Sequence, residues 1–272
     1  MLPPVLFVRG GALGDFVLTL PVLAELFAAG RRVDVVCAAK HLPLVRLCGE
    51  PGFAYDILGP DSAWTFGGLS PVPYAEAVCF SEARAHELPV PRVHWVAERP
   101  PAGVPAWQHF SSVWAQISGV RPCDPGIVLG TRATEAGTAP VECGVGSRPP
   151  AGPIVIAPGA SSPAKTWPLE QWFRLAEALR AAGHSVQIVG GPLEPWAEHR
   201  PELPELIQLL SGTSIFIGPD SGPAHLAARL GADTWVVCTQ PTSIQWVPYG
   251  AVALPGETSI ESILLGLRGT GG

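Results

Sequence analysis

The sequence predicts an α/β fold of two domains, each built around a parallel β-sheet. The chain has 272 residues, which is more than one hydrophobic core usually holds. Short apolar runs alternate with segments of helical periodicity, an order that favours parallel strands joined by helices. The order of strand, glycine-containing loop and helix near residue 5 recurs near residue 154. We therefore expect two similar domains, at residues 1–150 and 151–272.

The N-terminal domain begins with a strand, a glycine turn and a helix. An apolar run ends at two glycines, and apolar residues at helical spacing follow. Prolines interrupt the pattern over residues 49–104, where only short strands are expected. The expected elements of this domain are strands at 5–8, 32–37, 77–80 and 93–96 and helices at 16–27, 42–47 and 105–120.

A linker is expected at residues 131–153, which are rich in Gly, Pro, Thr and Glu and show no periodicity. The C-terminal domain follows it. Its expected elements are strands at 154–157, 185–189, 215–217 and 234–238 and helices at 169–182, 203–210, 223–230 and 259–267. Both domains should thus be Rossmann-like, and open parallel sheets bind ligands at the loops after the carboxyl ends of their strands.

Composition excludes several classes of protein. Hydrophobic residues make up 47% and charged residues 15% of the chain, which excludes a disordered protein. A net charge of −6 without a basic stripe argues against a nucleic-acid partner. No apolar run approaches the roughly 20 residues of a membrane span, and the first run is too short for a signal peptide, so we expect a cytoplasmic protein. Six cysteines without paired spacing are expected to be reduced structural thiols, and no metal site is predicted.

The first glycine loop runs from Arg9 to Asp15. Gly11 and Gly14 permit a tight turn and a close backbone approach, while the helix start offers free N–H groups to a polar ligand. The loop does not have the dinucleotide fingerprint of glycines. Asp15 could be a helix cap or a catalytic base, and the local sequence favours the cap.

The second loop follows the strand at 154–157 and contains Ser161, Ser162 and Lys165. Two hydroxyls and an ammonium near a helix start are suited to a diphosphate, because they combine hydrogen-bond donors with a point charge. An ordinary capped loop would have the same residues. The local sequence leaves both interpretations open.

Two further loops of the C-terminal domain contain polar residues. Glu194 follows the strand at 185–189, where an acidic residue can accept hydrogen bonds from ribose, although it could equally be a solvated loop charge. After the strand at 215–217, the amides of Ser221 and Gly222 begin a helix and could face a phosphate, with Asp220 accepting sugar hydroxyls. His225 lies in the first turn of that helix, where a histidine is usually only packed.

These motifs, taken in order, resemble a known family. They are Gly-Ala-Leu-Gly-Asp15, Gly-Ala-Ser-Ser-x-x-Lys165-x-Trp-Pro, Gly-Gly-Pro-x-Glu194, Asp220-Ser-Gly-Pro-x-His225-Leu and Pro241-Thr242 through Tyr249-Gly250. The chain is similar in these motifs to the ADP-heptose:lipopolysaccharide heptosyltransferases, glycosyltransferase family 9. The resemblance covers residues 5–30 and 154–250, whereas residues 50–150 resemble no family.

The resemblance implies a GT-B fold, with the acceptor in the N-terminal domain and the nucleotide-sugar donor in the C-terminal domain, the two facing a central cleft. It implies an inverting transfer of a sugar, heptose from ADP-heptose, to a lipopolysaccharide core or related glycan acceptor. No metal or cofactor is implied beyond the ADP-linked co-substrate. Because such acceptors can be glycolipids, a peripheral contact with the cytoplasmic face of the inner membrane would follow, although no polybasic cluster supports tight binding there.

The resemblance also implies roles for single residues. Asp15 would deprotonate the acceptor hydroxyl, which reverses the preference for a cap, and Gly11 and Gly14 would shape the acceptor loop. The donor would be held by residues of the C-terminal domain: phosphates by Ser161, Ser162, Lys165 and the amides of Ser221 and Gly222, ribose by Glu194, and heptose hydroxyls by Asp220, with His225 nearby.

Three alternatives stay open. The N-terminal domain and residues 194–215 are shorter than is usual in this family. A paralogue with another nucleotide-sugar donor or another acceptor, and a non-catalytic relative that only binds sugar nucleotides, both fit that shortening. A Rossmann oxidoreductase fits poorly, because neither glycine loop has the dinucleotide fingerprint and no Tyr-Lys or Cys-His constellation is present.

Overall fold

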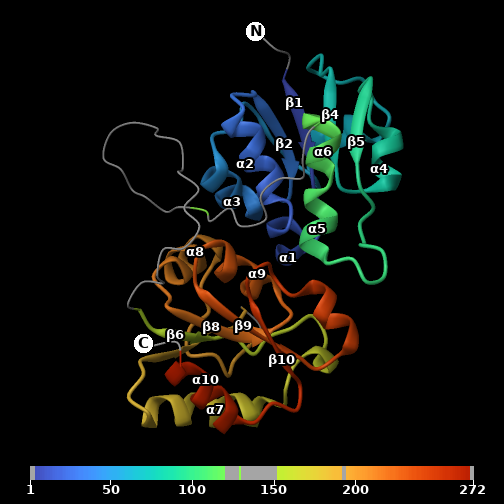
Figure 1. Cartoon of the computed structure of the whole chain (residues 1–272). Helices are drawn as coiled ribbons and strands as arrows, with labels where there is room; N and C mark the ends of the chain where they lie inside the picture. The colour runs from blue at the N-terminus through green and yellow to red at the C-terminus, as the bar shows by residue number, and fades with distance from the viewer. Residues whose placement is uncertain (1–3, 120–128, 130–151, 192–193, 270–272) are drawn as a thin grey trace. The chain divides into compact units, whose positions relative to one another are not determined.

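The computed structural model describes residues 4–119, 129, 152–191 and 194–269 (Figure 1). The chain divides into two compact units, Met1–Cys143 and Gly144–Gly272. Each unit contains a five-stranded parallel sheet with helices between its strands. The predicted α/β class and the two Rossmann-like halves are therefore confirmed.

The sheet of the first unit has the strand order β3-β2-β1-β4-β5. The central strand β1 is continuously apolar, and β1 and β2 are buried along their whole length, as expected for parallel strands covered on both faces. The strands are β1 (Val5–Val8), β2 (Val33–Cys37), β3 (Ala54–Asp56), β4 (Glu76–Cys79) and β5 (Arg92–Trp95). The helices are α1 (Leu13–Val17), α2 (Leu20–Ala28), η1 (Ala39–His41), α3 (Leu42–Cys48), η2 (Pro60–Phe66), α4 (Glu82–Glu87), α5 (Ala106–Ser111) and α6 (Val113–Ser118), where η denotes a 3₁₀ helix.

The sheet of the second unit has the order β10-β9-β8-β6-β7. Its strands are β6 (Ile154–Ile156), β7 (Val186–Ile188), β8 (Ile215–Pro219), β9 (Asp233–Cys238) and β10 (Val252–Pro255). Its helices are η3 (Pro163–Lys165), α7 (Leu169–Ala181), α8 (Leu203–Ser211), α9 (Gly222–Arg229), η4 (Pro241–Trp246) and α10 (Ile260–Gly269). In Figure 1, α7 and α10 cover one face of this sheet and α8 and α9 the other.

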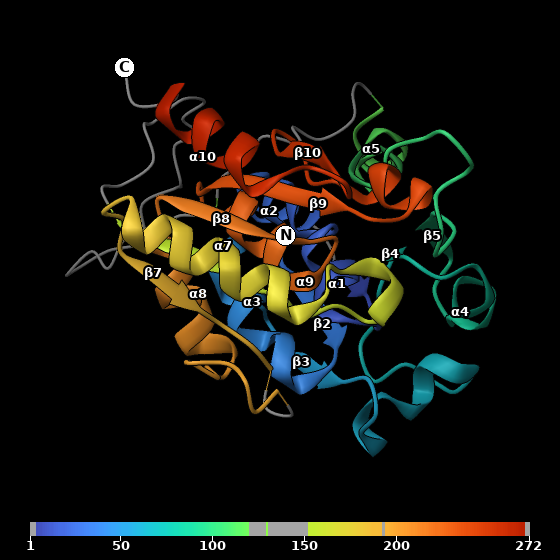
Figure 2. The same ribbon diagram turned by 90° about the horizontal axis from the view of Figure 1, so that it is seen from below.

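The core of the second unit lies between its sheet and the pair α7 and α10, which run side by side in Figure 2. Apolar residues at helical spacing on α7, among them Trp172, Leu175 and Leu179, pack there against Ile263 of α10. Each fully buried side chain of this size stabilises the fold by roughly 1.5–3 kcal/mol. This packing fixes the start of α7, and with it the loop that contains Lys165.

Two expected helices are each divided into two. The helix expected at 16–27 breaks between α1 and α2, where the Thr19 hydroxyl donates to the Phe16 carbonyl and Pro21 lies in the first turn of the second helix. The helix expected at 105–120 breaks at Ser112, whose hydroxyl donates to the His109 carbonyl. Hydroxyls that bond to backbone carbonyls interrupt helices in a way that apolar periodicity does not reveal.

Three of the described strands and α-helices were not expected from the sequence, and neither were the 3₁₀ helices. The three are the edge strands β3 and β10, which have no run of buried residues, and α4, a short helix of mostly polar residues that is capped by Ser81. The expected linker at 131–153 lies almost wholly outside the described residues. No helix among the described residues is long and apolar enough to cross a membrane.

Candidate functional site

Asp15 follows β1, at the carboxyl end of the first sheet. It occupies the third position of α1 rather than the cap, so the expectation of an N-cap is wrong in detail. Its carboxylate still accepts the Ala12 N–H at 3.3 Å. The side chain is 37% exposed, so its other face is open to solvent. Asp15 therefore combines a backbone anchor with an accessible carboxylate.

Gly11 is the residue that leaves room for this carboxylate. Its φ of 96° lies in the left-handed region, and a Cβ added there would lie 3.1 Å from the Oδ2 atom of Asp15. Gly14 lies within α1, next to Asp15. Gly11 thus leaves the space that the side chain of the candidate base occupies.

Arg9 is a site residue that the sequence analysis did not single out. Its side chain is 5% exposed, and Nη2 lies 3.7 Å from the Oδ1 atom of Asp15. Nε donates to the Asp15 carbonyl at 3.3 Å, and Nη1 donates to the Phe80 carbonyl at 2.8 Å. Burial lowers the pKa of the guanidinium, and the charges of Asp15 and Glu98 raise it in part. An arginine still keeps its charge at neutral pH.

Lys165 and Asp220 meet at the carboxyl end of the second sheet. Lys165 ends η3 in the loop after β6, and Asp220 follows β8, the neighbouring strand. The ammonium donates to the Oδ2 atom of Asp220 at 3.0 Å. Asp220 is 6% exposed and the Lys165 side chain 34% exposed, so the ion pair reaches from the interior towards solvent.

His225 lies on the inner side of this pair. Its Nε2 atom is 3.8 Å from the Oδ1 atom of Asp220, and the imidazole is 4% exposed. Burial alone raises the pKa of the Asp220 carboxyl, but the contacts with His225 and Lys165 together outweigh burial and hold the pKa below its ordinary value. From the sequence, all three residues were assigned to the donor, but in two separate loops, and the pairing of Asp220 with the lysine was not predicted.

The two serines of the same loop have different surroundings. Ser162 caps η3, and its hydroxyl accepts the Ala164 N–H at 3.3 Å. Ser161 is exposed. The loop is held from the next strand end, because Thr239 and Gln240 both donate to the Ala164 carbonyl, at 2.7 and 3.1 Å. These two residues after β9 also belong to the site and were not predicted.

Ser221 and Gly222 begin α9 at the end of β8. Ser221 is the N-cap in an extended conformation, but its hydroxyl makes no cap hydrogen bond. That hydroxyl is a buried oxygen without a hydrogen-bond partner among the described residues. The free N–H groups of the first turn therefore share this helix end with an unsatisfied hydroxyl, which is a suitable place for an anionic ligand.

Glu194 lies in the turn after β7. Its carboxylate accepts the Gly191 N–H, and it fills space that two glycines leave empty. A Cβ added to Gly159 would lie 2.6 Å from the Oε1 atom of Glu194, and one added to Gly190 would lie 3.0 Å from Oε2. The structure thus brings Glu194 against the beginning of the loop that contains Ser161, Ser162 and Lys165.

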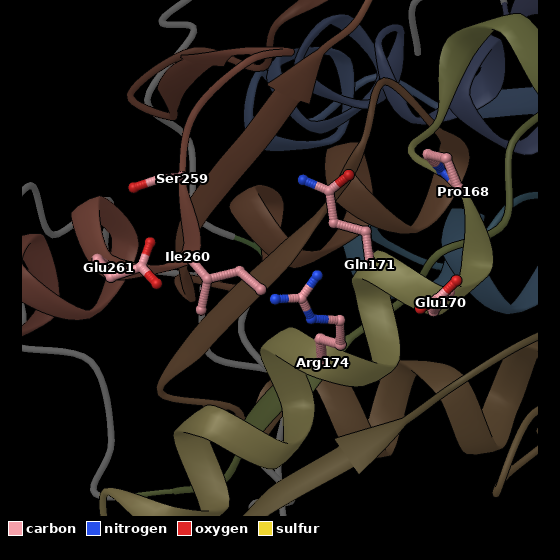
Figure 3. A pocket seen from close by; sticks show the side chains of 7 residues that line it. All are labelled: Pro168, Glu170, Gln171, Arg174, Ser259, Ile260 and Glu261. Carbon is pink, nitrogen blue, oxygen red and sulfur yellow. The ribbon is translucent and has the colours of Figure 1, made fainter.

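A separate pocket of about 350 Å³ lies between the beginnings of α7 and α10 (Figure 3). Gln171 and Arg174 extend into it from α7, and Ile260 faces them from α10 (Figure 3). The residues that line this pocket include both acidic and basic side chains, Glu170, Glu261 and Arg174. None of the residues predicted to form the site lines it. Among the described residues, no group of three or more His, Cys, Asp or Glu side chains could hold a metal ion.

Comparisons with known proteins show a family and a fold to which the chain is similar. Residues 132–253 match the family model described as glycosyltransferase family 9 (heptosyltransferase), which confirms the resemblance that the motifs predicted. No curated protein sequence matches the chain.

Solved structures are similar in fold. The Escherichia coli heptosyltransferase WaaC with ADP has a TM-score of 0.69 and 14% identity, over 98% of this chain and 99% of that chain. The E. coli ADP-heptose lps heptosyltransferase II has a TM-score of 0.67 and 16% identity, over 98% of each chain. A family 9 glycosyl transferase from Veillonella parvula has a TM-score of 0.68 and 16% identity, over 97% of this chain and 91% of that chain. These likenesses show that the predicted GT-B-like fold is correct.

Proposed function

We propose that this chain, which has a glycosyltransferase family 9 domain at residues 132–253, transfers heptose from ADP-heptose to a lipopolysaccharide core or related glycan acceptor. In this proposal the first unit binds the acceptor and the second unit binds the donor. The co-substrate is an ADP-linked sugar, and neither a metal nor another cofactor takes part. The reaction takes place in the cytoplasm, with at most a peripheral contact with the membrane.

The observation that best supports this proposal is the pairing of Lys165 with Asp220 beside the beginning of α9. One edge of the parallel sheet holds the Lys165 ammonium, the free amides of Ser221 and Gly222, and the unsatisfied hydroxyl of Ser221. Diphosphates are bound by such combinations of helix N-terminus and point charge. WaaC, which has the same fold, is described in complexes with ADP and with ADP-2-deoxy-2-fluoro heptose.

The proposed reaction is an inverting displacement. The acceptor hydroxyl oxygen attacks the anomeric carbon while Asp15 takes the hydroxyl proton. The bond between the anomeric carbon and the diphosphate oxygen breaks, and its electron pair leaves with the nucleoside diphosphate. Lys165 and the amides at the start of α9 stabilise the charge that develops on this leaving group.

The remaining residues position the donor. Glu194 accepts hydrogen bonds from ribose hydroxyls, because its carboxylate has a second oxygen besides the one that accepts the Gly191 N–H. Asp220 meets sugar hydroxyls with His225 nearby, while Ser161 and Ser162 donate to the phosphates. The ion pair of Lys165 with Asp220 supports this assignment, because the sugar and the diphosphate of one donor molecule are adjacent.

Calorimetric titration with ADP, UDP, GDP and NAD tests donor binding. Wild type should bind ADP selectively, and Lys165→Ala should weaken binding by about tenfold, the loss expected for one charged hydrogen bond. The matched control is Lys40→Ala, since Lys40 is the only other lysine and is exposed. Preference for UDP or GDP would indicate a paralogue with another donor, and preference for NAD an oxidoreductase. Binding of none of the four would contradict the proposal.

A transfer assay tests catalysis. Purified lipopolysaccharide core truncated before its heptoses is incubated with ADP-heptose, and the product is analysed by mass spectrometry. Asp15→Asn should retain the ADP affinity of wild type and lose transfer. Selective ADP binding by wild type without transfer would favour the non-catalytic relative.

A further inference from the structure

Arg9 is a buried cation whose position is fixed from several directions. Its guanidinium lies 5.0 Å from the ring centre of Phe110 and 5.8 Å from that of Phe80. The hydrogen bond to the Phe80 carbonyl at 2.8 Å ties it to the end of β4. The side chain therefore links the carboxyl ends of β1 and β4 with α5, and it has little freedom to move.

Asp15 is the one carboxylate within 4.0 Å of Arg9 in the part of the chain that the structure describes. Arg9 contacts it twice, at the carboxylate through Nη2 and at the main-chain carbonyl through Nε. A buried charge is costly to desolvate, and a well-packed apolar side chain often stabilises such a position equally well. Packing alone therefore does not explain an arginine here, whereas the position of Asp15 does.

The Asp15 carboxylate is confined on three sides. One carboxylate oxygen contacts Arg9, and the other accepts the Ala12 N–H. The backbone at position 11 lies against the third side of the carboxylate. The exposed side of the carboxylate is accessible to a substrate. Without Arg9 the carboxylate would keep only the 3.3 Å contact with Ala12 and could rotate away.

We infer that Arg9 is a positioning residue that holds the Asp15 carboxylate in the orientation in which it accepts the acceptor proton. This inference rests on the proposed function, since it assumes that Asp15 is the base. Arg9 has little exposed surface of its own and acts through Asp15. Displacement of a catalytic group by about 1 Å can lower a rate by about 10²-fold, so loss of this contact should lower kcat.

The first test measures whether the two residues are coupled without using catalysis. Urea unfolding midpoints are compared for wild type, Arg9→Met, Asp15→Asn and the double variant. Coupling predicts that the double variant is less destabilised than the sum of the two single variants. Additive shifts would overturn the inference. Arg84→Met is the matched control, because Arg84 lies 4.1 Å from the Phe66 ring centre and has no contact with Asp15.

The second test separates positioning from folding. In the transfer assay, Arg9→Met should lower kcat by about 10²-fold and leave the donor KM and the ADP affinity within about twofold of wild type. Arg9→Lys, which keeps the charge, should recover part of kcat, and Arg84→Met should match wild type. An unchanged kcat in a folded Arg9→Met protein would overturn the inference. Should wild type bind ADP but transfer nothing, the proposed catalysis would be wrong, and Arg9 would be a structural partner only.

Discussion

Lys165 donates to Asp220 across 3.0 Å and so joins the loop after β6 to the turn before α9. These segments are 55 residues apart in the chain, but they follow neighbouring strands of one sheet. The pair brings the residues predicted to bind phosphate and those predicted to bind sugar into direct contact. It also ties the loop that contains Lys165 to the buried side chain of Asp220.

Loss of Lys165 should therefore lower stability. Removing one partner of a fully buried pair costs about 3–5 kcal/mol, but Lys165 is one-third exposed, so Lys165→Ala should lower the free energy of unfolding by only about 1 kcal/mol. Urea unfolding monitored by tryptophan fluorescence would measure it. Lys40→Ala is expected to unfold like wild type, and an equal loss in both variants would contradict this account.

Asp220 should make the fold sensitive to acid. Its pKa is lowered in the folded state, so its contribution to stability is present above the ordinary value of 3.8 and is lost as the pH falls through the folded value. As the pH falls from 5 to below 3.8, the free energy of unfolding should decrease less in Asp220→Asn than in wild type. Unfolding free energies measured along that range would test it, with the exposed Asp61→Asn as control. Parallel curves for wild type and Asp220→Asn would refute the pairing.

His41 should produce a second dependence on pH. It is fully buried against Phe16, neither ring nitrogen has a hydrogen-bond partner among the described residues, and burial, with the charge of Lys40, lowers its pKa to about 4. The folded state keeps this imidazole neutral, so stability is complete above the ordinary value of 6.5 and falls as the pH drops towards 4. Wild type should lose about 2 kcal/mol between pH 7 and pH 5 through this group.

His41→Phe should remove that loss, because phenylalanine binds no proton and can keep the ring contact with Phe16. Thermal unfolding at pH 7 and pH 5 measures the difference. The comparison variant is His184→Phe, in which an exposed imidazole is replaced. If His41→Phe lost as much stability on acidification as wild type did, His41 would not be the group that titrates.

Gly159→Ala should disturb Glu194. The added Cβ would lie 2.6 Å from the Glu194 carboxylate, which must then move. Because this carboxylate is the end of a flexible side chain, we expect only a small loss in unfolding free energy, and weaker ADP binding because the carboxylate is displaced. Gly212→Ala is the control, because its nearest neighbour would be 3.7 Å away. A tolerated Gly159→Ala with unchanged ADP affinity would show that Glu194 is free to move.

The sequence predicted the central strands of both sheets, and it assigned candidate roles to polar residues in the loops that follow strands. Lys165 and Asp220 were identified because each follows an apolar run, and parallel topology brings neighbouring strand ends together. Arg9 was missed because one arginine after a strand has no pattern, and its burial depends on Phe110, about 100 residues away. Thr239 and Gln240 were missed for a similar reason, since only the folded loop presents the Ala164 carbonyl to them.

Local hydrogen bonds account for the remaining differences in the fold. Thr19 and Ser112 end helices through hydroxyl bonds to carbonyls, and neither residue interrupts the apolar spacing that predicted a longer helix. The strands β3 and β10 lie at sheet edges, where one side lacks a partner strand, and neither strand contains a buried residue.

In both units a glycine lies against a carboxylate, Gly11 against Asp15 and Gly159 against Glu194. Each acidic side chain occupies the volume that a methyl group would need. Replacing the acid would remove this restriction at position 159, whereas position 11 would still favour glycine because its φ of 96° lies in the left-handed region. An alanine at position 159 should therefore be tolerated once Glu194 is replaced by a smaller residue, and an alanine at position 11 should remain strained even without Asp15.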